Sequence, residues 1–202
     1  MSQIALPLQI EGSSAASSIV VGNANRAVVE ALKEPSSWPF GTSVLAGPAR
    51  SGKSLLGQWI GGQGVTVIDG ADSLPEDSLF HRWNAAQEEG TPLLLITDSQ
   101  PWEISLPDLK SRLGAALQLE VGVPDDEMAG QLIESLALQR GLTLADGAAD
   151  YLVPRADRSF AALEQLVAAI DRLSLERKAP ATMSVWRDAL DQTIGPEQAR
   201  LL

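Results

Sequence analysis

The chain has 202 residues, no cysteine and a formal net charge of −11 at pH 7. The lack of cysteine excludes disulfides and thiolate metal sites, and 15 basic against 26 acidic residues argue against an extended nucleic-acid-binding surface. The sequence contains no signal peptide and no apolar run long enough to span a bilayer, so we expect a soluble, cytoplasmic protein with no membrane partner.

The first 18 residues differ in composition from the rest, because a short apolar peptide is followed by a Gly/Ser/Ala-rich stretch. We expect residues 1–18 to be a tethered tail rather than a packed element. In extended form, the peptide can place a Gln amide in a polar subsite and apolar side chains in a hydrophobic pocket, while its proline lowers the entropy cost of ordering. The alternatives are an N-terminal strand and a disordered start of the chain. The peptide consists of Gln3, Ile4, Ala5, Leu6, Pro7 and Leu8.

Residues 19–122 alternate strand and helix signals. Short apolar runs bounded by Gly, Pro or Asp predict parallel strands buried on both faces, at Val44–Ala46, Val65–Ile68, Leu93–Thr97 and Leu117–Val121. Helical stretches lie between them, at Asn25–Leu32, Lys53–Ile60, Asp77–Glu89 and Leu106–Leu113. This alternation predicts a three-layer α/β sandwich with a parallel sheet.

From residue 123 to residue 202 the pattern is helical throughout. Apolar residues at helical spacing follow Pro124, and further helices are expected at Ala145–Leu152, around residues 160–173 and at Ser184–Gln192. We therefore expect three parts: the tail at 1–18, an α/β core at 19–122 and an all-helical domain at 123–202.

The clearest motif is G-x-x-x-x-G-K-[ST] at residues 47–54, between a predicted strand and a predicted helix. Its glycines let successive N–H groups turn around a phosphate, Lys53 reaches the outer phosphates, and the Ser54 hydroxyl ligates Mg²⁺. A glycine-rich turn without a ligand is the alternative, which the flanking elements disfavour. The predicted phosphate-binding residues are Gly47, Pro48, Ala49, Arg50, Ser51, Gly52, Lys53, Ser54 and Leu55, and the expected cofactors are ADP or ATP with Mg²⁺.

Two further strand ends carry polar residues. Asp69, at the end of a predicted buried strand, is in the position of a carboxylate that holds the Mg²⁺ hydration shell, although an ordinary Asp-Gly turn is the alternative. The next residue is Gly70, at the position where P-loop enzymes that hydrolyse their nucleotide have an acid that orients water. Thr97 and Asp98 end the next strand, and we favour Thr97 as the residue that senses the terminal phosphate. The single histidine, His81, is expected on a helix surface.

Several segments resemble the AAA+ ATPases of the DnaA and Hda type. Residues 18–25 resemble the adenine-side motif, which would place Val21 at the base, and 106–113 resemble the segment that carries the arginine finger, at Arg112. Residues 156–160 lie where these proteins have a nucleotide-sensing arginine, which points to Arg158, with Arg155 as the competing candidate. The N-terminal hexapeptide resembles the clamp-binding peptide of Hda-type proteins. The helical part would then be a lid.

This resemblance implies a regulator of replication initiation with little or no ATPase activity of its own. In this hypothesis, the hexapeptide binds the sliding clamp (the β subunit of DNA polymerase III), and Arg112 acts in trans as a catalytic residue on ATP bound to DnaA. We expect no direct sequence-specific DNA binding, because no DNA-binding domain follows the helical part. The sequence leaves open whether the protein forms a homo-oligomer. The alternatives are a self-contained P-loop ATPase, a replication-protein loader or scaffold and, for Arg112, an ordinary salt-bridging surface arginine.

Overall fold

The computed structural model describes residues 19–98 and 101–194. Two compact units are present, one formed by residues 25–122 and the other by residues 19–24 together with 123–194. The N-terminal hexapeptide and linker lie outside the described residues. Each unit is built around its own apolar core.

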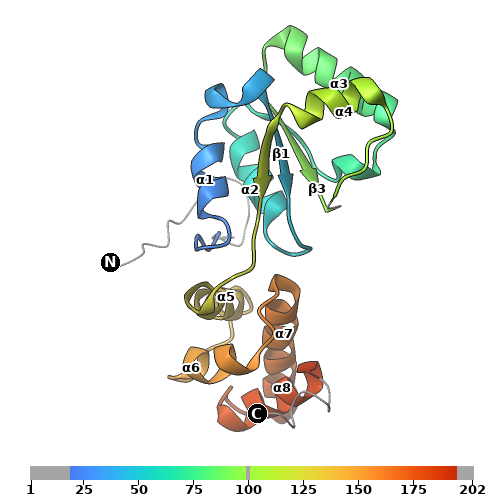
Figure 1. The fold of residues 1–202 in the computed structure, drawn as a ribbon. Coiled ribbons are helices and arrows are strands. Elements are labelled where there is room, and N and C mark those ends of the chain that lie inside the picture. Colours follow the sequence, from blue (N-terminus) through green and yellow to red (C-terminus); the bar gives the residue numbers. More distant parts are fainter. Residues whose placement is uncertain (1–18, 99–100, 195–202) are drawn as a thin grey trace. The chain divides into compact units, whose positions relative to one another are not determined.

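The unit formed by residues 25–122 contains a four-stranded parallel sheet in the order β2-β3-β1-β4 (Figure 1). In register, Thr42 of β1 lies opposite Leu93 of β3 on one side, and Ser43 lies opposite Leu117 of β4 on the other. Because all strands run the same way, their carboxyl ends meet at one edge of the sheet. The strands are β1 (Thr42–Ala46), β2 (Thr66–Ile68), β3 (Leu93–Thr97) and β4 (Leu117–Glu120).

Helices cover both faces of this sheet. One face packs its alternating residues, such as Leu93 and Leu95, against α3 and α4. On the other face α2 approaches so closely that a Cβ atom at Gly57 would lie 2.7 Å from the Ile96 side chain. The predicted three-layer sandwich is therefore confirmed. Its helices are α1 (Arg26–Leu32), α2 (Lys53–Gly61), α3 (Glu76–Glu89) and α4 (Pro107–Gly114).

The expected burial of every strand on both faces is wrong for β2 and β4. The central strands β1 and β3 are buried at every position, but β2 exposes Thr66, and β4 exposes Gln118 and Glu120. Each of these two strands has one strand neighbour within the described sheet. Edge position therefore accounts for their polar residues. Short 3₁₀ helices that we did not predict occur at Pro35–Ser37, Pro39–Gly41, Ala71–Ser73 and Val153–Arg155.

The second unit is helical, as predicted. Asp125 caps α5 by accepting a hydrogen bond from the Met128 N–H, and Ser159 caps α7 in the same way. The short α6 begins three residues later than expected, after Gly147 with φ +80°. No described helix is long and apolar enough to cross a bilayer. The helices are α5 (Asp126–Gln139), α6 (Ala148–Leu152), α7 (Phe160–Arg177) and α8 (Met183–Ile194).

Residues 19–24, expected in the α/β core, group with the helical unit. The Asn23 side chain donates to the Val123 carbonyl (3.0 Å) and accepts from the Asp125 N–H (2.9 Å). Gly22 lies against Met128 so closely that a Cβ atom there would be 2.7 Å from its side chain. These contacts fasten the segment to the start of α5.

Helix α5 offers a matched pair of substitutions that tests the helical core. Ile133 is fully buried, whereas Leu138 on the same helix is 79% exposed. We expect Ile133→Ala to lower the free energy of unfolding by about 2–5 kcal/mol, because it removes buried methyl groups and leaves a cavity. Leu138→Ala should change it by less than about 0.5 kcal/mol. Urea titrations followed by circular dichroism measure both, and equal effects would contradict the core assignment.

Candidate functional site

The predicted phosphate-binding loop connects β1 to α2, in the strand–loop–helix context that its motif requires. Gly52 has φ +86° and immediately precedes α2. Gly47 has φ +153°, and a Cβ atom there would lie 2.9 Å from the Val121 Cβ, so only glycine fits. Arg50 adopts φ +65° without being glycine. A left-handed non-glycine residue is a strained conformation of the kind that gathers at ligand sites.

Lys53 points back into this loop. Its side chain is 5% exposed, and its Nζ donates to the carbonyls of Gly47 and Pro48, both at 2.9 Å. The same ammonium forms an ion pair of 2.7 Å with Asp98, whose side chain is 73% exposed. Lys53 is thus fixed at the loop by two carbonyls and one carboxylate. A phosphate bound here would share this ammonium with Asp98 or take its place.

The ion pair with Lys53 bears on the choice between Thr97 and Asp98 at the end of β3. We favoured Thr97 because a carboxylate at position 98 would repel phosphate unless a cation screened it. The structure supplies that cation, because Asp98 contacts Lys53 directly. Thr97 is the last residue of β3 and is only 1% exposed. Asp98 is therefore the residue that the geometry brings to the loop, whereas the sequence interpretation considered both and favoured Thr97.

The loop contains one buried polar atom without a partner in the described structure, the Ser51 hydroxyl. Buried hydroxyls are usually hydrogen-bonded, so this one fits a site that a phosphate oxygen completes. Ser54 is exposed in the first turn of α2, and Asp69 is exposed after β2. Their oxygens suit Mg²⁺. No cluster of three or more potential metal ligands occurs among the described residues, so Mg²⁺ would take most of its ligands from phosphate and water.

Gly70 occupies the position after Asp69 with φ +65°. A glutamate at this position would be strained, because L side chains rarely adopt the left-handed backbone conformation. The local geometry therefore suits glycine and not the acid that orients water in hydrolysing enzymes. A 3₁₀ turn, Ala71–Ser73, follows directly.

Arg112 lies in the last turn of α4, immediately before β4, as the sequence predicted. Its guanidinium carbon is 4.5 Å from the Phe80 ring centroid and 4.3 Å from that of Trp83, and its Nη1 donates to the Asn84 side-chain oxygen. Phe80, Trp83 and Asn84 lie on one side of α3, and we call them the Arg112 holder. Their spacing of three and four residues was visible in the sequence, but their packing against α4 was not.

Three predicted or competing nucleotide contacts lie in the helical unit. Arg158 precedes α7 and forms an exposed ion pair of 2.9 Å with Asp126. Arg155 stacks over the Tyr151 ring at 4.3 Å and donates to the Tyr151 carbonyl. Val21 is half-buried in the segment fastened to α5. In the other unit, His81 is exposed on α3, as expected.

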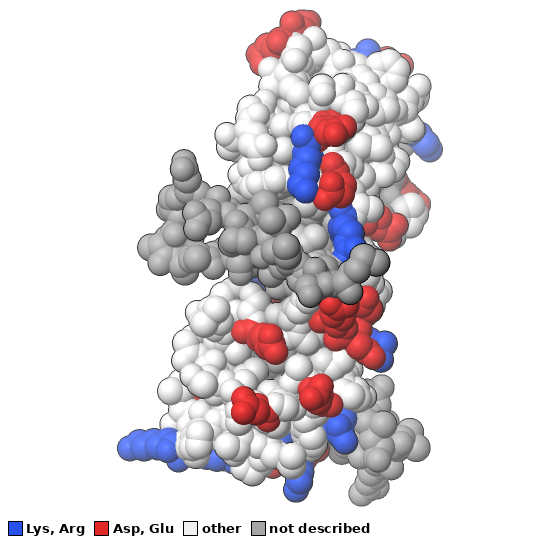
Figure 2. Space-filling view, turned by 90° about the vertical axis from the view of Figure 1, so that its left-hand side faces the viewer, with Lys and Arg blue, Asp and Glu red and all other residues white. Residues whose placement is uncertain are grey.

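Charged side chains of both signs are interspersed on the face drawn in Figure 2. Local ion pairs among the described residues include Lys33 with Glu30 (2.8 Å) and Arg177 with Asp188 (2.6 Å). Exposed pairs of this kind contribute little to stability.

Comparison with known proteins gives two kinds of match. Residues 126–190 match the family model described as "Hda, lid domain". In addition, 119 residues are 28% identical to the chromosomal replication initiator protein DnaA of Lactiplantibacillus plantarum, covering 57% of this chain and 26% of that protein. The chain is an AAA+ protein of the DnaA/Hda family. It spans about half or less of the length of the curated relatives it matches.

Solved structures agree with this family's fold. Domain III of Thermotoga maritima DnaA superposes with a TM-score of 0.75 at 15% identity, covering 96% of this chain and 100% of that one. The AMPPCP-bound DnaA of Aquifex aeolicus gives a TM-score of 0.63 at 20% identity, covering 86% of this chain and 68% of that one. At these identities the likeness establishes the AAA+ fold.

The role of Lys53 in nucleotide binding can be tested by substitution. We expect Lys53→Ala to weaken ADP and ATP binding by about 10- to 150-fold, because a charge-assisted contact to phosphate is lost. Lys33→Ala, which removes an exposed lysine elsewhere in the same unit, should leave the affinity unchanged. Isothermal titration calorimetry measures both. Unchanged affinity in Lys53→Ala would overturn the assignment of the loop as a phosphate site.

Proposed function

We propose that this protein is a nucleotide-binding regulator of DnaA that stimulates hydrolysis of DnaA-bound ATP while tethered to the sliding clamp. In this way it lowers the initiation of DNA replication. We place it in the cytoplasm, where both proposed partners act. Its own loop holds ADP or ATP with Mg²⁺, as the loop geometry and the AMPPCP-bound DnaA relative suggest.

The position of Arg112 in the sheet unit carries this proposal. Helix α4 connects the carboxyl end of β3 to the amino end of β4, so its last turn lies at the amino edge of the sheet (Figure 1). The phosphate-binding loop lies at the opposite, carboxyl edge. An arginine at the far end of the sheet cannot reach its own loop, which supports a role toward a neighbouring molecule.

The Arg112 holder does not prevent such a role. A cation–π contact at a partly exposed site contributes about 0.5–1 kcal/mol. An arginine supplied in trans to a phosphoryl-transfer site raises the rate by about 10³- to 10⁵-fold, which is several kcal/mol. The exchange also gives up the hydrogen bond to Asn84, which for a charged donor contributes about 1.5–3 kcal/mol. The exchange is favourable where the gain at the phosphate exceeds the sum of these contacts. The holder keeps the guanidinium in place until a partner offers that charge.

Weak intrinsic hydrolysis is the second part of the proposal. Gly70 supplies no carboxylate to orient water, and its left-handed backbone disfavours one at that position. The nucleotide bound by this chain then acts as a structural ligand. When this protein is mixed with ATP-loaded DnaA, we assign the hydrolysis to the ATP that is bound to DnaA.

The decisive test measures phosphate release from ATP-loaded DnaA in the presence of this protein and DNA-loaded clamp. We expect stimulation by the native chain and none by Arg112→Ala, because the guanidinium acts on charge that develops in the transition state. Arg112→Lys should restore little, since an ammonium lacks the planar fork. Arg82→Ala, on the exposed side of α3, is the matched control and should stimulate fully.

The opposite results are equally clear. Full stimulation by Arg112→Ala would exclude Arg112 as the residue that acts in trans. Robust phosphate release by this protein alone would favour the alternative of a self-contained P-loop ATPase or loader.

Tethering to the clamp is tested separately. Gln3→Ala combined with Leu6→Ala should remove binding to the clamp while nucleotide binding persists, because both the polar and an apolar anchor of the peptide are lost. Gln9→Ala combined with Ile10→Ala changes the same types of residue just outside the hexapeptide and should have no effect. Analytical size-exclusion chromatography with purified clamp measures complex formation. Co-elution of the first double variant with the clamp would contradict the tether.

A further inference from the structure

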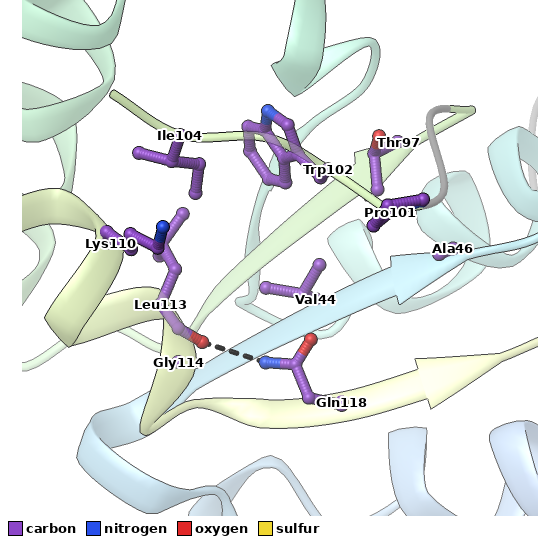
Figure 3. A pocket seen from close by; sticks show the side chains of 10 residues that line it. All are labelled: Val44, Ala46, Thr97, Pro101, Trp102, Ile104, Lys110, Leu113, Gly114 and Gln118. Carbon is purple, nitrogen blue, oxygen red and sulfur yellow. Dashed lines mark hydrogen bonds between the residues drawn. The ribbon is translucent and has the colours of Figure 1, made fainter. Parts of the chain in front are cut away.

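A concave pocket of about 700 Å³ lies on the α4 side of the sheet. Its walls come from β1, β3 and β4, from helix α4 and from the segment around Trp102 and Ile104 (Figure 3). Its volume lies within the range of about 300–1,000 Å³ that is usual for small-molecule sites. None of residues 47–54 lines it, but Ala46 and Thr97, at the carboxyl ends of β1 and β3, do, so the pocket adjoins the phosphate-binding loop without including it.

Hydrogen bonds fix the walls of this pocket. The Glu76 carboxylate accepts the backbone N–H groups of Ser105 (2.8 Å) and Leu106 (2.6 Å), which holds the segment that follows Ile104. Across the pocket, the Gln118 amide donates to the carbonyls of Leu113 (2.8 Å) and Ala116 (3.1 Å). Little ordering is therefore needed when a ligand enters, and preorganisation of this kind favours binding.

The chemistry of the lining is that of an amphipathic site. Val44 and Leu113 form a buried apolar floor, and the half-buried Trp102 and Ile104 face them. Lys110 is the one ionisable residue among the described residues of the lining. Apolar walls offer no partner for a hydrated inorganic ion, which would lose its water without replacement. Lys110 is exposed, so its ammonium stays hydrated beside a neutral ligand, whereas an anionic group would form an ion pair with it.

We propose that this pocket binds a small organic anion with an aromatic or branched aliphatic body. The body packs between Trp102 and the floor formed by Val44 and Leu113, and its anionic group reaches the Lys110 ammonium. This site is independent of the role of Arg112, which points from the same helix toward α3.

Gly114 provides a way to close the pocket without damage to the fold. It lines the pocket, its φ is not left-handed, and a Cβ atom built there meets no atom within 4 Å. A leucine side chain at this position extends from the pocket lining into open space, and we expect it to narrow the cavity. Replacement of a glycine in a helix also favours the helical conformation.

The test uses 2-naphthoate and its neutral counterpart 2-naphthalenemethanol as probes of the full chain. Binding is followed by ¹H–¹⁵N NMR at the Trp102 indole and the Gly114 amide. We expect naphthoate to shift both signals and to bind about three- to fivefold more tightly than the alcohol, the size of effect expected for an exposed ion pair. Lys110→Gln should equalise the two affinities, and Gly114→Leu should abolish binding of both at the Trp102 indole. Leu138→Ala, in the helical unit, should change neither.

Three results would overturn the proposal. The first is that naphthoate shifts signals elsewhere but not that of the Trp102 indole. The second is that Gly114→Leu binds naphthoate as tightly as the native chain does. The third is that the alcohol binds as tightly as naphthoate to the native chain. Addition of AMPPCP distinguishes the two sites, because displacement of naphthoate by AMPPCP would assign the signal to the phosphate-binding loop instead.

Discussion

The arrangement of this site depends on the parallel pairing of β1 with β3 on one side and β4 on the other. Parallel strands bring their carboxyl ends to one edge, so segments that are distant in sequence meet there. Val121, after β4, backs Gly47 and forces that position to be glycine. Asp98, after β3, reaches Lys53. Both contacts join the loop after β1 to a neighbouring strand, and neither would exist if one of these strands ran the other way.

The sequence predicted the layers and most element boundaries, because buried runs such as residues 93–96 are apolar at every position whatever surrounds them. It did not separate central strands from edge strands, since this depends on strand order and not on local composition. It also placed the start of α6 too early, although Gly147 was a visible signal. Motif residues were easier to find than their partners. The phosphate-binding loop has a fixed pattern, whereas the ion pair between Lys53 and Asp98 depends on how two strands lie side by side.

For Arg112, too, the sequence located the residue but not the side chains that it contacts. A pattern resemblance located this arginine, and the structure places it in the expected last turn of α4. That its guanidinium lies over Phe80 and Trp83 depends on the packing of α4 against α3. Planar rings hold a guanidinium through weak contacts on its faces. Together with the hydrogen bond to Asn84, these contacts restrict the side chain, and all of them must be exchanged if the group acts on a partner.

The two chemical elements of the sheet unit thus lie at opposite edges of one sheet. The loop at the carboxyl edge has the parts for binding phosphate, but Gly70 leaves it without the acid that hydrolysis needs. A nucleotide that is bound and not turned over stabilises the folded chain by mass action, by about 2.7 kcal/mol at a concentration of 100 times its dissociation constant. Arg112, at the amino edge, has no phosphate of its own to act on. In the division of roles that we propose, nucleotide binding maintains the protein, and Arg112 acts only when a second molecule supplies the phosphate.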